Sequence, residues 1–428
     1  MFKVGYAERI LEVPLFTEMY GYGPFAGRRS LGVRDPLYCR AATFNDGKWR
    51  NMIIYTDTCT TCELQARTMR VELASKLGMR PDGIMFIATH THSAPFLQMQ
   101  TECSVGWGEP LPEFQEIWKA AVRKVAFDAV HNEEPVTAEA GRAPLSQKLA
   151  ANRVHKDTDE TDPDIRWVRF IRKDGSVKLL MHNHGIHGIA AGPSMKCSAD
   201  WMGEANRLIV ERKLADHPLF LQSAAGDVNT VTCWKSPDPA ISEIGSRYVA
   251  DLEKSIAAGG KKIEVTPVQA AFKTIELPTI QQTAEELRAE AENPVVKEKM
   301  PEHAKRIFEL AILVERDGEL RSFKDMQVLR MGEITIYVFP GEPFVSSGKQ
   351  IMNASPSPFP MVATVANGSG AYFAPKEIFD EHPKIDSDKS WGFFGFYEIY
   401  CYPSQMRMKY RSDVADVVIN ELLNMKTG

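Results

Sequence analysis

The sequence is organised around one stretch that ends in two histidines, Ile84-Met85-Phe86-Ile87-Ala88-Thr89-His90-Thr91-His92-Ser93-Ala94-Pro95. Its first five residues are apolar and follow a Pro-Asp-Gly turn, which is typical of a strand covered on both faces. Open α/β sheets place ligand sites beyond the carboxyl ends of their strands. His90 and His92 point the same way in an extended segment, because side chains repeat with a period of two. The stretch predicts a buried strand that delivers two imidazoles to one place. By itself, such a pair is as consistent with two structural, hydrogen-bonded histidines as with a metal or catalytic site.

Strand-like and helical runs alternate along the chain. The strand-like runs lie at 38–44, 52–56, 84–88, 167–171, 177–181, 219–221, 325–329, 334–339 and 362–366. The helical runs lie at 62–77, 114–125, 201–214 and 414–423, and we expect Asp200 to cap the third of them. This order predicts an α/β fold, with a large mixed β-sheet core flanked by helices.

Residues 283–317 differ in composition from the rest of the chain. They are rich in Glu, Lys, Arg and Ala, and prolines at 294 and 301 interrupt them. Charge runs of this kind usually form solvated helices. We therefore expect a helical insertion near 283–317 within one large domain that spans residues 1–428.

Composition limits the classes of partner. The chain of 428 residues has a formal net charge of -5, with 44% hydrophobic and 25% charged residues. This balance argues against a nucleic-acid-binding surface and favours a small-molecule substrate. The chain shows no signal-peptide pattern and no apolar run of membrane-spanning length, so we expect a cytoplasmic protein without stable membrane association.

The cysteines do not form a disulfide framework. There are seven, an odd number, scattered without regular spacing, which favours reduced thiols. Cys59 and Cys62 form a single CxxC where a strand passes into a helix. Without a second such pair, we interpret them as two structural thiols.

Further metal-type side chains follow other predicted strands. His182, His184 and His187 come at and after the strand at 177–181, and Glu342 follows the strand at 334–339 through Pro340-Gly341. Catalytic zinc commonly takes histidine nitrogens and carboxylate oxygens and leaves one position open. Iron would accept the same ligands for oxygen chemistry. The residues alone leave the ligand set and the metal open.

Six motifs occur in a fixed order over almost the whole chain. They are Gly21-Tyr22-Gly23 with Gly32-Val33-Arg34-Asp35-Pro36-Leu37; Thr89 to Pro95; Asn152-Arg153; His187 with Ser198-Ala199-Asp200-Trp201; Pro340-Gly341-Glu342; and Asn367 to Tyr372 with Tyr397-Glu398. Each motif is weak alone, but together they resemble the neutral, non-lysosomal ceramidases and their broader superfamily.

The resemblance implies a single ceramidase-like catalytic domain with one zinc ion per chain. By that resemblance, the metal ligands are His90, His187, Glu342 and Tyr372, and the catalytic and substrate-binding residues are His92, Arg153 and Tyr397. It implies a hydrolase in which metal-bound water attacks an amide, ester or lactone carbonyl. His184 is the rival of His187, which we prefer for its spacing to Ser198-Ala199-Asp200-Trp201.

The chain departs from the family pattern in three places. Gly226-Asp227-Val228-Asn229 stands where ceramidases carry a Gly-Asp-Val-Ser segment, and an amide is no nucleophile, so Asn229 excludes a covalent serine mechanism there. The interval from Tyr372 to Tyr397 looks longer than in the family. We also expect no C-terminal immunoglobulin-like domain.

The predicted rim segments bear on the substrate. Residues 96–112 and 376–390 are mixed and polar, whereas Trp391, Phe393, Phe394 and Phe396 are aromatic and fit a pocket wall near Tyr397. We therefore predict a small, soluble, polar substrate. The alternatives are a true ceramidase that acts on N-acylsphingosine, and a non-catalytic metal-binding or ligand-binding protein on the same scaffold.

Overall fold

The computed structural model describes residues 1–22, 27–97, 110–232, 237–299, 301–368, 371–382, 395–402 and 407–428. Most of the two predicted rim segments, together with Trp391, Phe393 and Phe394, lies outside these described residues.

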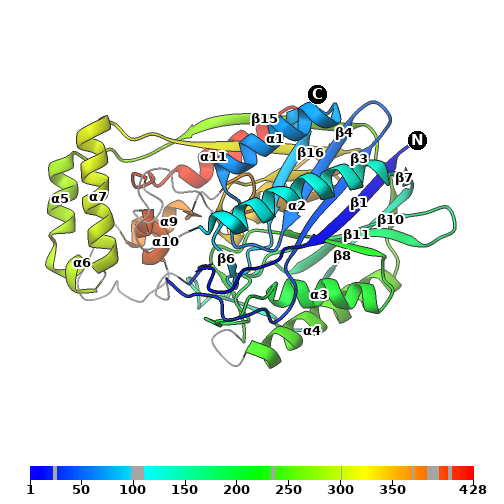
Figure 1. Cartoon of the computed structure of the whole chain (residues 1–428), viewed down its shortest axis with the longest axis horizontal. Coiled ribbons are helices and arrows are strands. Elements are labelled where there is room, and N and C mark those ends of the chain that lie inside the picture. Colours follow the sequence, from blue (N-terminus) through cyan, green and yellow to red (C-terminus); the bar gives the residue numbers. More distant parts are fainter. Residues whose placement is uncertain are drawn as a thin grey trace.

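Three mixed sheets form the body of the molecule (Figure 1). The first has the order β5 (Ile84–Ala88), β4 (Arg50–Thr56), β3 (Tyr38–Asn45), β1 (Lys3–Ile10) and β7 (Glu134–Pro135). The second has the order β12 (His217–Gln222), β11 (Val177–His184), β10 (Asp164–Ile171), β8 (Thr137–Pro144) and β14 (Lys261–Ile263). The third has the order β15 (Val268–Leu277), β16 (Ser322–Met331), β17 (Ile334–Val338) and β19 (Phe359–Ala363).

Each sheet contains one parallel pair of strands at its edge, joined through a helix. The three units are β4-α1-β5 with α1 at Glu63–Leu77, β11-α3-β12 with α3 at Asp200–Glu211, and β17-α8-β19 with α8 at Val345–Ala354. The other pairs within these sheets are antiparallel, as short connections allow. His90, His187 and Glu342 each follow a strand of a different parallel pair.

The carboxyl ends of these pairs meet. Thr364, after β19, donates its backbone N–H to the carbonyl of Gln222 at 2.8 Å, and Thr91 and Gly188 form a parallel bridge. Short two-stranded sheets join the loops beyond the ends: β18 (Glu342–Pro343) with β20 (Tyr372–Phe373), β9 (Ala150–Asn152) with β13 (Val228–Thr230), and β2 (Met19–Tyr20) with β6 (Ala94–Pro95). One region therefore collects the residues that follow all three sheets.

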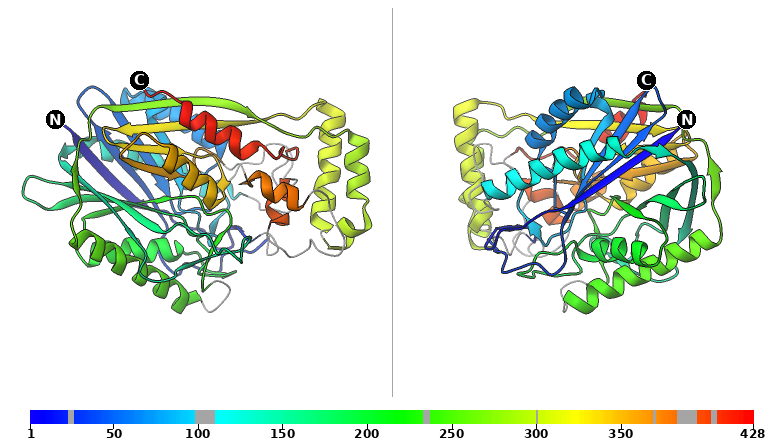
Figure 2. Two further views of the ribbon diagram at one scale, coloured as in Figure 1. Left: turned by 180° about the vertical axis from the view of Figure 1, so that it is seen from behind. Right: turned by 45° about the vertical axis from the view of Figure 1, so that its right-hand side comes forward.

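Strand β5 is buried on both faces, as its continuous apolar run predicted. Ile84 and Phe86 pack in the cluster formed with α1 and α2 (Pro112–His131), whereas Met85 and Ile87 pack in the central cluster shared with the second sheet. Helices α3 and α4 (Pro237–Ala257) cover the outer face of the second sheet (Figure 1). Helices α8 and α11 (Val414–Asn424) cover the third (Figure 2).

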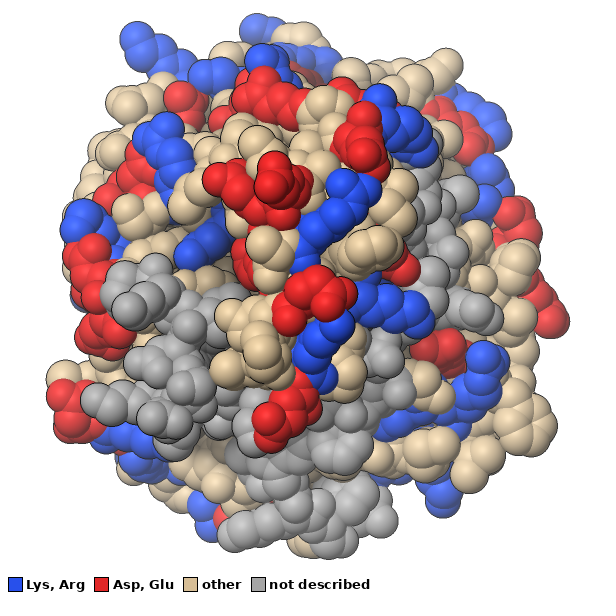
Figure 3. Space-filling view, turned by 90° about the vertical axis from the view of Figure 1, so that its left-hand side faces the viewer, with Lys and Arg blue, Asp and Glu red and all other residues tan. Residues whose placement is uncertain are grey.

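The helical insertion consists of α5 (Ala284–Ala291), α6 (Pro294–Lys299) and α7 (Pro301–Asp317), which project from one end of the molecule (Figure 1). A capping box between Thr283 and Glu286 begins α5. Opposite charges are interspersed on the face that carries the insertion, without a large single-sign patch, as Figure 3 shows. These features confirm the predicted α/β class with a helical insertion.

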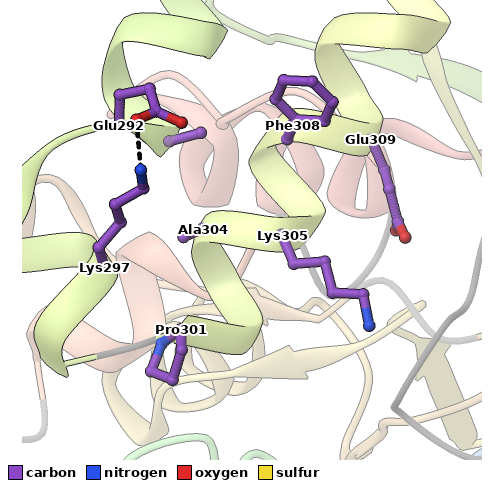
Figure 4. Close-up of a pocket in the computed structure, with 8 residues that line it drawn as sticks. Glu292, Lys297, Pro301, Ala304, Lys305, Phe308 and Glu309 are labelled. Carbon is purple, nitrogen blue, oxygen red and sulfur yellow. Dashed lines mark hydrogen bonds and ion pairs between the residues drawn. The ribbon is translucent and has the colours of Figure 1, made fainter.

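The insertion also contains a cavity of ≈ 460 Å³ (Figure 4). Its apolar lining includes Ala304 and Phe308, and its rim carries Lys305, Glu309 and the ion pair between Glu292 and Lys297. The inner side of the insertion packs against α9 (Lys376–Glu381) and α10 (Phe396–Tyr400), and the Tyr402 hydroxyl donates to Glu290 Oε1 at 2.8 Å. The insertion thus supports the segment that carries Tyr397 and Glu398.

The expected N-cap role of Asp200 is wrong. Ala199 is the N-cap, and Asp200 is the first residue of α3 with a left-handed φ of 57°. Its carboxylate accepts backbone N–H groups of Ala190 at 3.0 Å and Ala191 at 2.8 Å. The side chain therefore fixes the loop after His187 to the start of α3. Within the described residues, no helix combines the length and apolar character needed to cross a bilayer.

Candidate metal centre

Two histidines and one glutamate converge at the ends of the three parallel pairs. His90 Nε2 lies 3.2 Å from Glu342 Oε2, and His187 Nε2 lies 3.3 Å from the same oxygen. The ligand atoms of these three residues all lie within 4.8 Å of one another. Both histidines are buried, and the Glu342 side chain is 14% exposed. The three ligand atoms therefore lie in a largely buried site.

Backbone carbonyls orient both imidazoles. His90 Nδ1 lies 2.8 Å from the carbonyl of Cys59, and His187 Nδ1 lies 2.7 Å from the carbonyl of Ala225. A carbonyl only accepts, so Nδ1–H donates in each ring and the Nε2 lone pair faces Glu342 in the neutral form.

The facing atoms fit a divalent ion. His187 Nε2 and Glu342 Oε2 are buried and make no hydrogen bond within the described residues. Buried polar atoms are normally paired, and two histidine nitrogens with one carboxylate oxygen are a common catalytic zinc set. The chemistry of these donors therefore matches the implied metal.

The same three side chains perturb one another electrostatically. Burial favours neutral imidazole, but Glu342 and Cys59 outweigh it and raise the pKa of His90 well above its usual value. Burial and the nearby Arg153 lower the pKa of His187 to about 4. Burial opposes ionisation of Glu342, yet His90 and His187 hold its pKa well below the usual range. A carboxylate that stays ionised beside imidazole nitrogens is suited to a cation.

Tyr372 is the fourth residue implied as a ligand. Strands β18 and β20 run parallel, with Glu342 paired to Tyr372. Burial and the Glu342 carboxylate raise the pKa of the Tyr372 phenol well above its usual value. The preceding Ala371 has a φ of 60°, and His90 has a φ of 67°. Left-handed backbone at such residues carries strain, which clusters at functional sites.

His92 lies beside the pair of histidines. Its Nε2 is 3.3 Å from His90 Nε2, and its Nδ1 accepts the backbone N–H of Tyr22 at 3.3 Å. That contact assigns the ring proton to Nε2, on the side of the centre. Burial and the two other histidines lower the pKa of His92 well below its usual value, which keeps the ring neutral.

The Gly-Tyr motif near the N-terminus explains how His92 is held. Gly21 has a φ of 94°, and a Cβ there would lie 2.5 Å from Cγ of the His92 ring. Arg28 donates to the carbonyl of His92 at 2.7 Å. Only glycine allows the loop to lie against the ring this closely.

Arg153 extends toward the centre from the loop after β9. Its Nη1 donates to Asn229 Oδ1 at 3.2 Å, and its Nη2 donates to the carbonyl of Gly226 at 2.6 Å. The guanidinium lies 5.3 Å from the centroid of the Tyr372 ring. The ring centroids of Tyr372 and Tyr397 are 5.7 Å apart. The structure therefore brings all seven predicted site residues into one neighbourhood.

A second combination of metal-type atoms involves Cys59, His90 and His92. Cys59 Sγ lies 3.8 Å from His90 Nδ1, which already donates to the Cys59 carbonyl. Burial raises the pKa of the Cys59 thiol, so the thiolate that a metal needs is disfavoured. The set with His187 and Glu342 is therefore the better metal site. Cys59 and Cys62 are both buried.

Three residues of this site have contacts that the sequence patterns do not predict. Asn229, which the sequence marks only as the absence of a nucleophile, accepts a hydrogen bond from Arg153. Tyr22 and Glu398 belong to the ordered motifs, and their contacts with His92 and Arg153 join segments far apart in the chain. The Asn-Arg and Tyr-Glu pairs were the available signal, but spacing along the chain does not pair Arg153 with Glu398.

The fold is that of the neutral ceramidases. A structure of neutral ceramidase from Pseudomonas aeruginosa matches 98% of this chain and 75% of that one, with a TM-score of 0.72 and 15% identity. A ceramidase complexed with C2 matches 100% of this chain and 76% of its own, with a TM-score of 0.72 and 14% identity. No family model and no curated protein matches the sequence. The six ordered motifs thus predicted the fold correctly, and likeness at this identity speaks for the fold alone.

Proposed function

We propose that this protein is a zinc-dependent hydrolase that cleaves an amide, or an ester or lactone, of a small soluble substrate. The observation that carries the proposal is the convergence of His90, His187 and Glu342, with ligand atoms within 4.8 Å of one another and two of them lacking hydrogen bonds. The neutral ceramidase-like fold supports the same class of reaction.

The ion would be held by His90, His187, Glu342 and Tyr372. When bound, zinc supplies a Lewis acid and lowers the pKa of water toward neutrality. Two neutral imidazoles and one carboxylate leave a net positive charge at such a centre, as this chemistry requires. The carbonyl contacts of Cys59 and Ala225 hold the two rings in place before the ion arrives.

The neighbouring donors would bind the scissile carbonyl. The neutral His92 ring directs its Nε2–H toward the centre. The guanidinium of Arg153 lies beside the Tyr372 ring, and hydrogen bonds to Asn229 and Gly226 fix its orientation. Tyr397 packs at the ring of Tyr372 and is half-buried, so its hydroxyl is suited to contact the substrate. Such donors stabilise the oxyanion of acyl transfer without reorganisation.

A ceramidase activity is the second candidate. Large apolar side chains are exposed on the loop that positions His92 and on the segment bonded to it: Leu15, Phe16, Leu31, Val33 and Met195. The backbone N–H of Leu31 donates to the Met195 carbonyl at 2.8 Å, which joins the two segments. Exposed apolar surface favours a lipid substrate. Against it stand the polar residues of the predicted rim.

A substrate screen separates the candidates. Metal content of the purified protein is measured by elemental analysis, and hydrolysis is followed for soluble N-acyl, ester and lactone compounds beside short-chain and long-chain ceramides. We expect about one zinc ion per chain and turnover of a soluble compound. Efficient cleavage confined to long-chain ceramide in detergent would overturn the proposed substrate class. Absence of any bound divalent metal would overturn the proposed mechanism.

A further inference from the structure

We propose that Glu398 is a positioning residue that holds Arg153 and balances its charge, so that the centre can take up a divalent cation beside a buried guanidinium. This inference rests on the proposed function in one respect: the site must bind a divalent cation.

The contact between the two side chains is direct and buried. Glu398 Oε1 lies 2.9 Å from Arg153 Nη2, with side-chain exposures of 0% for Glu398 and 8% for Arg153. Glu398 Oε2 accepts the backbone N–H of Gly395, whereas Oε1 makes no hydrogen bond within the described residues and acts on Arg153 through its charge. Burial raises the pKa of Glu398 and the guanidinium opposes that change. A permanent cation at 2.9 Å favours the ionised form of the carboxylate.

The positive charges of the metal ion and of Arg153 explain why Arg153 needs an ion pair with Glu398. A divalent ion held by one carboxylate retains positive charge, and Arg153 adds another positive charge close by. Two cationic groups repel strongly in a poorly solvated site, where Coulomb energies are several times those in water. A buried guanidinium without an anionic partner is also costly by itself. Glu398 removes both penalties.

Two further hydrogen bonds of Arg153 are made to neutral groups. Asn229 Oδ1 and the Gly226 carbonyl orient the guanidinium but are neutral. The nearby carboxylate of Asp227 accepts from Asn152 Nδ2 at 2.7 Å and from the Val345 N–H at 2.8 Å. Glu342 is committed to the two histidines. Within the described part of the chain, Glu398 is a buried carboxylate at ion-pair distance from the guanidinium.

The fold keeps Glu398 in place. Its neighbours Ile399 and Tyr400 pack in the cluster that contains Leu287, Ile307 and Leu310 of the insertion. The pair therefore couples the charge of Arg153 to a helix that the insertion supports. A carboxylate on such a buried element loses little entropy when it forms the ion pair.

Metal affinity tests the charge balance without relying on turnover. Zn²⁺ binding to metal-stripped protein is measured by competition with a chromophoric chelator, for wild type, Glu398→Gln, and the double variant Arg153→Ala/Glu398→Gln. We expect Glu398→Gln to weaken Zn²⁺ binding at least tenfold, because it leaves Arg153 uncompensated. The double variant removes both charges, and its affinity should return to within about threefold of wild type.

A shortened carboxylate separates charge from position. Glu398→Asp keeps the charge, so Zn²⁺ affinity should stay within about threefold of wild type, while kcat falls at least tenfold because Arg153 shifts. Glu421→Gln, which breaks a surface ion pair with Lys273, is the matched control for losing a carboxylate. Circular dichroism checks that each variant is folded.

Each outcome decides a separate claim. Wild-type protein that binds no Zn²⁺ overturns the proposed function, and the inference falls with it. Wild-type binding together with unchanged affinity in Glu398→Gln overturns the inference alone. Weak binding in Glu398→Gln that the double variant does not restore assigns Glu398 a structural role instead, which also contradicts the proposal.

Discussion

Two groups of histidines in this protein are equally buried but differ in what their ring nitrogens contact. At the metal centre, His90 and His187 each give one nitrogen to a backbone carbonyl and turn the other toward Glu342. On β11, His182 gives both nitrogens to neighbouring side chains: Nε2 donates to Asn206 Oδ1 at 3.0 Å, and Nδ1 accepts from the Tyr248 hydroxyl at 3.1 Å. Among His90, His187 and His182, burial therefore does not distinguish the candidate ligands from the structural histidine, but the contact of the second ring nitrogen does.

His184 is kept from the metal centre by its position on β11, although its Nε2, like that of His187, makes no hydrogen bond within the described residues. Its Nδ1 lies 3.0 Å from the Asp164 carbonyl, and 3.8 Å from the buried carboxylate of Asp162. It shares one face of β11 with His182, because the side chains repeat with a period of two, and both rings contact Tyr248. The strand ends at His184, so His187 lies in the following loop and reaches the centre.

Removing a ligand should have the largest effect. His90→Ala and Glu342→Ala are expected to lose the metal and activity together, since each leaves too few donors for a catalytic site. Elemental analysis and turnover are measured on the same preparations. His131→Ala, an exposed histidine on α2, is the control and should keep both. Metal content equal to wild type in the two ligand variants would sink the assignment.

Removing an oxyanion donor should spare the metal. Arg153→Ala and His92→Ala are expected to retain zinc but to lower kcat by about a hundredfold or more, the usual effect of losing one such donor. Steady-state kinetics and elemental analysis check this. Near-normal turnover in both variants would contradict the role given to these side chains.

Replacing a structural histidine should show the reverse pattern. His182→Ala removes two buried hydrogen bonds and leaves a cavity, which should lower the free energy of unfolding by roughly 2–4 kcal/mol. Urea unfolding gives the loss, and elemental analysis should show wild-type zinc. Loss of zinc from folded His182→Ala would contradict the assignment of His182 as a purely structural histidine.

The pH dependence of stability offers a further test of His182. Burial lowers its pKa to about 4, below the 6.5 of an exposed histidine. Between these values the unfolded chain binds more protons, so stability rises with pH through this window and is lost as pH falls from 6.5 toward 4. The contribution is on the order of 3 kcal/mol at most.

The variant His182→Asn isolates this contribution. The difference in unfolding free energy between metal-free wild type and His182→Asn should shrink as pH falls from 7 to 5, as measured by urea unfolding at each pH. A difference that stays constant over this range would show that His182 is not held neutral by burial.

The smallest effect is expected at Asn229. Its amide accepts from Arg153 Nη1, while Gly226 and Glu398 also hold that guanidinium. Asn229→Ala should therefore lower kcat only a few-fold and keep the zinc. A loss as large as that of Arg153→Ala would give Asn229 a direct part in the reaction.

Local patterns in the sequence determined much of the architecture. The apolar run at 84–88 predicted a strand buried on both faces, and the prolines at 294 and 301 marked the breaks between α5, α6 and α7. Such features depend on residues near in the chain, through periodicity and backbone restriction. Asp200 shows the limit of this reasoning, because its carboxylate binds two loop N–H groups nine and ten residues upstream in addition to the N–H of Trp201 at the helix start.

The site was only partly readable from the sequence. His90, His92, His187 and Glu342 were named because each follows a strand and matches an ordered motif, and the fold places them together. The sequence by itself thus determined which elements form and which side chains end them. Only the tertiary structure decided that Glu342 meets two imidazoles, that Gly21 lies against His92, and that Glu398 pairs with Arg153. These contacts join residues up to 252 positions apart, as for His90 and Glu342, and local propensity carries no information about such distances.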